Sequence, residues 1–301
     1  MSFTSDTKNE LTKIKPENKC CQLAEVSAFL RFSGLVDVDE DGPSVKVRTD
    51  NASVARHFIK LVKTYFGSRT ALSVEVGSPL VKGRIYELMI TREMNAELIL
   101  RETGILGVKE GSNYITEGLS REIVSKRCCR RSALKGAFLS RGSISDPLKS
   151  YHMELVCNSE RTAADIKRLL SGFGLKPRIV KRKGKSVVYI KEAEQIQDFL
   201  NIIGSTDQYF AFQDARILRE AKGRTNRIAN CESANMDKTV NASQRQLADI
   251  RVIEETRGLA YLSEKLRETA EMRKQYPELS LSELAELFDP PLKKSGLNNR
   301  F

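Results

Sequence analysis

The sequence predicts an α+β protein in which one unit of helices and strands occurs twice and a small all-helical unit follows. Two stretches, Cys20–Gly34 and Cys128–Gly142, each read as an apolar helix with a Cys pair at its start and a Gly at its end, and both features recur at the same separation. The same order of elements follows each stretch, whereas the residues after Ser243 show helical periodicity alone. A repeat this long indicates a duplicated domain rather than a solenoid.

The first copy is expected at about residues 18–106, within a domain that spans residues 1–205. Its opening helix is followed by a strand, a helix, two strands joined by a turn and a further helix. These elements are Ser44–Val47, Ala52–Phe66, the strands around Lys82-Gly83-Arg84, and Asn95–Leu106. The apolar residues after Ala52 recur at helical spacing, which predicts a stripe that faces the core.

The second copy is expected at about residues 126–204 and repeats that order. Its elements after the opening helix are Tyr151–Val156, Arg161–Gly172, the strands around Lys183-Gly184-Lys185, and Ala193–Ile203. The fold prediction is therefore a duplicated αββαββα domain whose halves face each other through their opening helices.

Residues 206–242 differ in composition from the copies. Tyr209–Lys222 predicts an amphipathic helix, and the polar stretch Gly223–Asn235 is rich in asparagine and typical of a linker. A second interpretation remains open, in which Arg224, Arg227 and the asparagines contact a phosphate backbone.

Residues 243–301 predict a small all-α unit. Ser243 is expected to cap a helix, and Ser280 with Glu283 forms a capping box at the start of a short helix. A turn at Asp289–Leu292 then leads to a last helix, which is the outline of a helix-turn-helix with its second helix in the major groove. Its candidate DNA-binding residues are Lys294, Ser295, Asn298, Asn299 and Arg300. A plain bundle of three or four helices with a solvated last helix is the alternative.

The chain carries 50 Lys and Arg against 39 Asp and Glu, a formal net charge of +11, and its sequence pI is about 9.3. This excess suits a polyanion, with nucleic acid the first candidate and an acidic membrane surface the second. Residues 176–185 hold a cluster of basic side chains without an acid. Its candidates for phosphate contact are Lys181, Arg182, Lys183 and Lys185. A solvated basic turn is the alternative.

The cysteines and histidines predict neither a metal centre nor an acid–base site. Four of the six cysteines form adjacent pairs, Cys20-Cys21 and Cys128-Cys129. Neighbours on a helix point about 100° apart, and the Cys-x-x-Cys spacing of zinc sites is missing. We expect reduced cysteines that pack as small apolar side chains where the helices meet. His57 and His152 are expected at the surface or the edge of the core, and no cofactor is expected.

No stretch of the sequence is apolar and long enough to span a membrane, and the N-terminus lacks a basic stretch followed by an apolar core. The sequence therefore predicts a soluble cytoplasmic protein with no membrane partner.

The duplicated unit, with small-residue helices that end at Gly34 and Gly142, resembles the two-repeat LAGLIDADG homing endonucleases. In that family the helix pair forms the interface, the sheets face DNA, and an acid before each Gly binds the divalent metal. Ser33 and Arg141 occupy those positions here. Because such metals need oxygen ligands, the resemblance implies the scaffold without the nuclease. Lys135, where the family has a small residue, predicts a looser or shifted helix pair.

The whole chain resembles the WhiA family of DNA-binding regulators, which is linked to sporulation and cell division in Gram-positive bacteria. The stretches that carry this resemblance are Gly136–Leu139, Gly142-Ser143, Asn230–Lys238, Gln244–Gln246, Leu281–Ala285 and Lys294–Phe301. The resemblance implies a non-enzymatic, sequence-specific transcription regulator that binds double-stranded promoter DNA and associates with the nucleoid. It also implies that the duplicated domain supplies a further DNA contact, a brace, or a surface for other proteins.

Two alternatives to this regulator remain open. An active DNA endonuclease needs carboxylates at the metal positions, and the nearest ones, Glu25 and Asp146, lie too far along the helix and in a loop. The duplicated domain would otherwise act mainly as an interaction module for transcription or division proteins.

Overall fold

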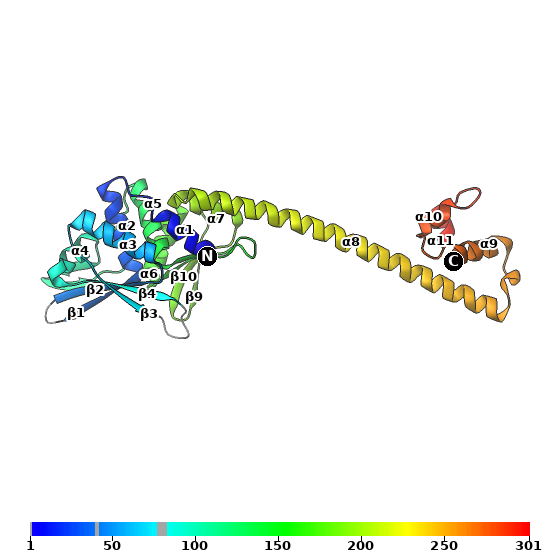
Figure 1. Cartoon of the computed structure of the whole chain (residues 1–301), viewed down its shortest axis with the longest axis horizontal. Coiled ribbons are helices and arrows are strands. Elements are labelled where there is room, and N and C mark those ends of the chain that lie inside the picture. The colour runs from blue at the N-terminus through cyan, green and yellow to red at the C-terminus, as the bar shows by residue number, and fades with distance from the viewer. Residues whose placement is uncertain (1, 40–41, 77–82) are drawn as a thin grey trace. The chain divides into compact units, whose positions relative to one another are not determined.

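The computed structural model describes residues 2–39, 42–76 and 83–301, and the chain divides into two compact units, Met1–Arg219 and Glu220–Phe301 (Figure 1). The first unit combines helices and sheets, and the second is helical. This composition confirms the predicted α+β fold class. None of the described helices combines the length and the apolar character of a membrane span.

The first repeat packs helices on one face of a four-stranded sheet. Its elements are α2 (Lys19–Ser33), β1 (Gly34–Asp39), β2 (Gly42–Thr49), α3 (Ala52–Phe66), β3 (Ala71–Val76), β4 (Arg84–Ile90), the 3₁₀ helix η1 (Arg92–Met94) and α4 (Ala96–Glu102). The strand order is β1-β2-β4-β3, and each neighbouring pair is antiparallel. Side chains of β2 alternate in burial because one face of the sheet packs on the helices. Lys82 of the predicted turn lies outside the described residues.

The second repeat has the same topology. Its elements are α5 (Arg127–Arg141), β7 (Gly142–Ile144), β8 (Met153–Cys157), α6 (Glu160–Ser171), β9 (Arg178–Arg182), β10 (Lys185–Ile190) and α7 (Ala193–Ile203). The order β7-β8-β10-β9 reproduces that of the first sheet, which confirms the predicted duplication. A hairpin of β5 (Leu106–Lys109) and β6 (Ser112–Ile115) follows the first repeat. The sequence did not predict it, because β6 is exposed throughout and has no apolar alternation.

The predicted αββαββα order requires two strands between the first two helices of each repeat, but the sequence located only one of them; β1 and β7 are the strands without a predicted range. Each begins at the residue that caps its helix, Gly34 or Gly142, so no loop separates helix from strand. A Cβ on Gly34 would meet the carbonyl oxygen of Leu30 at 2.5 Å, and one on Gly142 would meet a ring carbon of Phe138 at 2.3 Å. The glycines are therefore required by close approach to the preceding helical turn.

The opening helices α2 and α5 lie side by side at the centre of the first unit. A Cβ on Gly136 of α5 would meet the carbonyl oxygen of Glu25 on α2 at 2.3 Å. Small side chains that are fully buried on the two helices are Ala24, Ala28, Ala133 and Ala137. Of the predicted looser or shifted helix pair, the looser arrangement was wrong, because Lys135 is accommodated by a buried carboxylate rather than by separation of the helices. A shifted arrangement stays a prediction.

The N-terminal helix α1 (Phe3–Leu11) fixes the start of the long helix α8 (Thr206–Thr256). The carboxylate of Glu10 accepts hydrogen bonds from the backbone N–H groups of Asp207 at 2.8 Å and Gln208 at 3.1 Å. These groups have no partner within the helix, and a negative charge is favourable at a helix N-terminus. Glu10 therefore caps α8 from a segment far away in the sequence.

The expected linker is helical instead. α8 continues for 51 residues and includes the asparagine-rich stretch Gly223–Asn235. Gly223 is the one strong helix breaker within α8 and lowers the stability of the helix by about 1 kcal/mol. The helix tolerates this cost because helical turns are already formed on both sides of Gly223. Ser243 likewise lies inside α8 and caps no new helix. Its hydroxyl donates to the carbonyl oxygen of Pro277 at 2.5 Å.

The second unit has its own small core. After α8 come the 3₁₀ helix η2 (Leu259–Tyr261), α9 (Glu264–Gln275), α10 (Leu281–Glu286) and α11 (Lys294–Asn298). The buried core residues are Leu284, Ala285, Phe288 and Leu297. The predicted capping box is confirmed, since Ser280 Oγ accepts from the Glu283 N–H at 3.3 Å and Glu283 Oε2 accepts from the Ser280 N–H at 2.8 Å.

Candidate nucleic-acid interface

The last helix, α11, presents one polar face. Lys294, Ser295, Asn298 and Asn299 are exposed, whereas Leu297 is fully buried. Positions i, i+1, i+4 and i+5 share one side of a helix, so these four residues form a continuous surface, called here the α11 face. It offers an ammonium group, a hydroxyl and two amides, which are the groups that pair with phosphates and base edges.

The segments around α11 are held by backbone contacts. The N–H of Leu292 donates to the carbonyl oxygen of Ala285 at 2.9 Å, which closes the turn between α10 and α11. Arg273 is 1% exposed, and its Nη1 donates to the carbonyl oxygens of Tyr276 at 3.3 Å and Leu279 at 2.7 Å. A packed support of this kind keeps the α11 face in a fixed orientation within its unit.

Arg300 is separated from the other four predicted residues. Its guanidinium carbon lies 5.5 Å from the centre of the Phe288 ring, and its Nη1 lies 3.5 Å from Thr269 Oγ1 and 3.7 Å from Glu268 Oε2. These contacts direct Arg300 towards α9. The structure therefore gives it a packing role within the unit, and the α11 face does not include it.

The hairpin of β9 and β10 carries the predicted basic cluster. Lys181, Arg182, Lys183 and Lys185 are all exposed. Lys183 and Gly184 form the turn in the left-handed region, with φ of 50° and 73°. Lys181 Nζ lies 2.5 Å from Glu160 Oε1, and this hydrogen bond and the negative charge raise the pKa of Lys181. One of the four cations is thus already paired with a carboxylate.

Lys191 extends the basic surface at the other end of the same strands. A cavity of about 130 Å³ there is lined by Lys176, Arg178 and Lys191 together with Tyr189. Lys191 Nζ lies 5.5 Å from the centre of the Tyr189 ring, and the strand register places Tyr189 opposite Arg178. Lys191 is not among the predicted residues, because only the pairing of β9 with β10 brings it near the cluster.

The sheet of the first repeat shows no such excess of positive charge. On its less buried face, Arg48 lies opposite Glu87, and its Nε is 2.5 Å from the Glu87 carboxylate. Lys46 shares this face with Asp37 and Glu75, so positive and negative charges are nearly balanced among the described residues. The two repeats therefore differ in charge although they share a topology, and the second is the better surface for a polyanion.

The positions that correspond to the metal-binding acids of LAGLIDADG endonucleases offer no carboxylate. Ser33 is 4% exposed and its hydroxyl donates to the carbonyl oxygen of Phe29 at 2.9 Å, whereas Arg141 is exposed. Burial lowers the pKa of Lys8 to about 8, the charge of Asp50 opposes this shift, and the charge of Arg141 adds to it. A hydroxyl that is already bonded and two neighbouring cations do not favour a divalent metal.

Three ionisable side chains meet between the central helices. Glu25 is 1% exposed, and its Oε1 lies 2.6 Å from His57 Nε2 and 3.2 Å from Lys135 Nζ, which also donates to the carbonyl oxygen of Ile14 at 2.7 Å. Burial lowers the pKa of Lys135, while the charge and hydrogen bond of Glu25 oppose the shift. His57 is therefore a buried partner of Glu25, and the expectation of a surface or core-edge position was wrong. The sequence held a signal for this buried pair, because Glu25 and Lys135 each lie among apolar residues of their helix.

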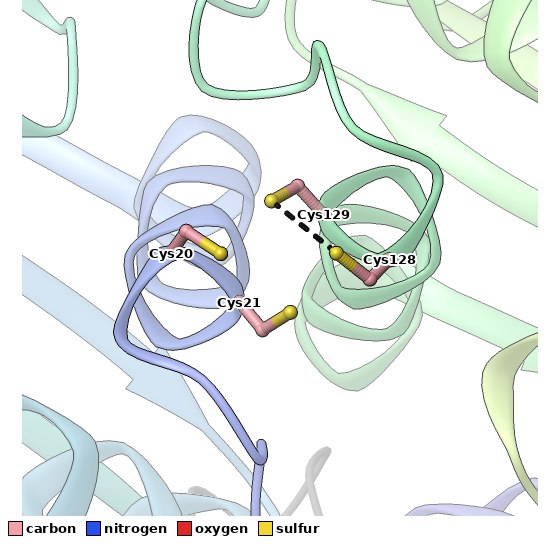
Figure 2. Close-up of side chains that lie close together, drawn as sticks. All are labelled: Cys20, Cys21, Cys128 and Cys129. Carbon is pink, nitrogen blue, oxygen red and sulfur yellow. Dashed lines mark hydrogen bonds between the residues drawn. The ribbon is translucent and has the colours of Figure 1, made fainter.

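Four cysteines meet at the first turns of α2 and α5 (Figure 2). The Sγ atoms of Cys20, Cys21, Cys128 and Cys129 all lie within 4.8 Å of one another. Cys21 and Cys129 are buried, Cys20 is half-buried and Cys128 is exposed. Burial raises the pKa of Cys129 to about 12, and a hydrogen bond with Cys21 lowers the pKa of Cys128. The spacing within one helix concerns each cysteine pair alone, whereas the packing of α2 on α5 brings the two pairs together.

Three family models match successive parts of the chain. The model of the WhiA N-terminal LAGLIDADG-like domain matches residues 19–106, that of the WhiA LAGLIDADG-like domain matches residues 130–222, and that of the WhiA C-terminal HTH domain matches residues 225–301. The matches cover both repeats, α8 and the helical unit.

Curated relatives match over the full length. A protein of Alkaliphilus metalliredigens named "Probable cell division protein WhiA" is 39% identical over 100% of this chain and 95% of that protein. Proteins of the same name from Heliobacterium modesticaldum and Thermoanaerobacter sp. are 40% and 42% identical over 100% of this chain, and cover 93% and 95% of their own lengths.

Solved structures support the fold. The crystal structure of full-length DUF199/WhiA from Thermatoga maritima is 24% identical, has a TM-score of 0.60, and is matched over 100% of this chain and 95% of that one. The N-terminal LAGLIDADG domain of DUF199/WhiA has a TM-score of 0.52 at 21% identity, over 67% of this chain and 90% of that one.

Proposed function

Because the chain belongs to the WhiA family, we propose that it is a sequence-specific DNA-binding regulator of transcription without nuclease activity. Its relatives are named cell division proteins, so control of cell division, and of sporulation where it occurs, is the proposed role. Double-stranded promoter DNA is the proposed partner, which implies association with the nucleoid in the cytoplasm.

The observation that carries this proposal is the α11 face on a helix-turn-helix unit. Four polar residues share one exposed side of the short helix that follows the capped helix α10. In proteins of this class the second helix contributes the contacts to base edges in the major groove. Lys294 is proposed to contact phosphate, and Asn298 and Asn299 are proposed to contact bases.

The first unit is proposed to contact DNA in a way that does not depend on the DNA sequence. The hairpin cations Arg182, Lys183 and Lys185 are exposed on the more basic of the two sheets. Contacts of Lys and Arg with phosphates add affinity that depends on salt and is largely independent of sequence. A protein-interaction role of the duplicated domain remains a second candidate, and the exposed apolar residues Leu35, Val38, Leu72 and Val74 of the first sheet favour it.

The absence of nuclease activity is proposed from the residues at the metal positions. Ser33 is buried and bonded to the backbone, and Arg141 is a cation. Glu25, a carboxylate further back along α2, pairs with His57 and Lys135. Phosphodiester cleavage of this type requires carboxylates that hold a divalent metal.

A titration of the full chain against DNA from upstream of its own gene and against a scrambled duplex tests the proposal. We expect preference for the upstream DNA at near-physiological salt and intact DNA when magnesium is present. Asn298→Ala should reduce the preference between the two duplexes by roughly 1–3 kcal/mol, and Lys265→Ala, an exposed change on α9, serves as the control. Equal binding to both duplexes would contradict the proposal of a sequence-specific regulator. Cleavage of the DNA would support the alternative of an active endonuclease.

A further inference from the structure

We propose that Cys20, Cys21, Cys128 and Cys129 form a binding site for a single Zn²⁺ ion, which joins the opening helices of the two repeats (Figure 2). The proposal goes beyond the DNA-binding function and does not depend on it. Its basis is the geometry of the four thiols, their positions on the helices and their unequal exposure.

The distances between the thiols fit one tetrahedral ion. A Zn–S bond of about 2.3 Å in a tetrahedron places the sulfur atoms about 3.8 Å apart. Here the Cys128 and Cys129 sulfurs are 4.0 Å apart, and all four sulfurs lie within 4.8 Å of one another. Rotamer changes and small shifts bring the remaining pairs to that distance. An iron–sulfur cluster places several irons between its thiolates and needs them further apart, so a mononuclear ion fits better.

The duplication explains how two adjacent pairs share an ion. Cys20 and Cys21 are the second and third residues of α2, and Cys128 and Cys129 hold the same positions in α5. In Figure 2 the four sulfurs point into the space between the first turns of the two helices, two from each side. Two pairs related by an approximate two-fold axis supply the four corners of a tetrahedron. The angle of about 100° between neighbours on a helix excludes a site built on one helix alone, but it does not exclude a shared one.

The electrostatic surroundings favour a negatively charged complex. Four thiolates and one Zn²⁺ carry a net charge of about −2. The N-termini of α2 and α5 direct partial positive charge at this point. A cavity of about 200 Å³ that includes Cys21 and Cys128 in its lining is also lined by three basic residues, Lys15, Arg131 and Lys135, and by two acidic ones, Glu17 and Glu25. Glu25 is paired with His57 and Lys135. The same cavity provides a route from solvent to the thiols.

Packing alone accounts poorly for the arrangement. Cysteines that serve as small apolar side chains are among the most buried residues in proteins, as Cys157 is at 0% exposure. Cys128, in contrast, is exposed and Cys20 is half-buried, yet both lie in the cluster. Thiolates are soft ligands that select zinc over magnesium or calcium. Closed four-cysteine sites of this kind are structural, so the ion would stabilise the helix pair and would not perform catalysis.

The test is to purify the full chain in reductant from medium that contains zinc and to measure bound metal by mass spectrometry. We expect about one zinc per chain. Cys128→Ser should lose most of the bound zinc and should still fold, because residue 128 is exposed. Cys231→Ser, at an exposed cysteine of α8 outside the cluster, should keep it.

Cobalt substitution reports the ligand set independently of stability. Added Co²⁺ should give thiolate-to-metal charge-transfer bands and the intense visible bands of a tetrahedral all-sulfur site, and Cys20→Ser should weaken both. A chelator should lower the unfolding temperature of the wild-type chain and of Cys231→Ser, and should not change that of Cys128→Ser.

Three results would overturn the proposal. One is a chain without zinc that also shows no cobalt bands in reductant. Another is bound zinc that both Cys20→Ser and Cys128→Ser retain. The third is recovery of a disulfide between α2 and α5 that persists in reductant, which would assign the cluster to a covalent cross-link in place of a metal.

Discussion

Glu25 of α2, Lys135 of α5 and His57 of α3 are three buried ionisable side chains that meet beside the helix pair. Lys135 occupies a position at which the endonuclease pattern has a small residue, and its ammonium group reaches both Glu25 and the carbonyl oxygen of Ile14. Glu25 Oε2 has no hydrogen-bond partner among the described residues. The network therefore depends on each member, because a buried charge that loses its partner is strongly unfavourable.

Lys135→Met should lower the free energy of unfolding by about 3 kcal/mol, since Glu25 would keep only His57 as a partner. Urea unfolding followed by circular dichroism measures this change. The double variant Glu25→Met/Lys135→Met should be more stable than Lys135→Met alone, because it removes the charge along with its partner. A double variant that is less stable than the single one would contradict the assignment.

Lys8 gives a pH dependence of known sign. Its pKa is lowered by burial to about 8, below the usual 10.4 or so of the unfolded chain. Between these values the unfolded chain binds the proton and the folded one does not, so this contribution to stability rises with pH from about 8 to about 10.4. Lys8→Met should therefore be more stable than wild type at pH 7, by up to about 3 kcal/mol, and the difference should shrink across that window. A stability difference between Lys8→Met and wild type that stays constant from about pH 7 to about pH 10.5 would contradict the lowered pKa of Lys8.

The elements of the two repeats match in order but differ in what they expose. The hairpin of β9 and β10 carries five exposed basic residues, whereas Arg48 on the first sheet is paired with Glu87. In the second unit, α11 is short, and its orientation comes from the core beneath it rather than from its own length. Each candidate DNA contact thus lies on an element that tertiary packing supports.

The hairpin should contribute affinity without specificity. Lys183→Ala/Lys185→Ala should reduce the slope of log K against log salt by up to about 2, since each phosphate contact adds about 0.9 on duplex DNA. Preference for upstream over scrambled DNA should remain. Fluorescence anisotropy at several salt concentrations measures both, with Lys109→Ala at an exposed position of β5 as the control. An unchanged slope would favour the protein-interaction role for this unit.

At the scale of the whole chain, two compact units carry different proposed roles. The first is organised by the α2 and α5 helix pair and two sheets, and the second by a core formed between α10 and α11 with contributions from α9. Their matches to separate WhiA domain models agree with this division. Joining a specific contact to a non-specific one raises overall affinity through effective concentration.

The isolated segment 220–301 should keep the preference for upstream DNA with lower affinity, by about tenfold or more. It contains the capping box, the core and the α11 face, so it has the contacts that fold it. Gel-shift titrations of this segment and of the full chain on the same duplexes make the comparison. If the segment folds but no longer prefers upstream over scrambled DNA, sequence recognition would be assigned to the first unit.

The sequence by itself determined the duplication, the order of most elements, the capping box at Ser280 and the family. These features depend on local signals, namely side-chain periodicity, turn residues and repeated motifs, which can be read along the chain. It misjudged residues 223–235, because a polar and asparagine-rich composition is typical of linkers and a helix supported on both sides tolerates it.

Only the tertiary structure decided which distant residues meet. Close packing of α2 on α5 brings Glu25 to Lys135 and the two cysteine pairs to each other, and strand register brings Lys191 to the hairpin strands. It also directs Arg300 towards α9 and leaves the α11 face exposed. These outcomes depend on contacts between segments far apart in the chain, which spacing within one helix or strand does not encode.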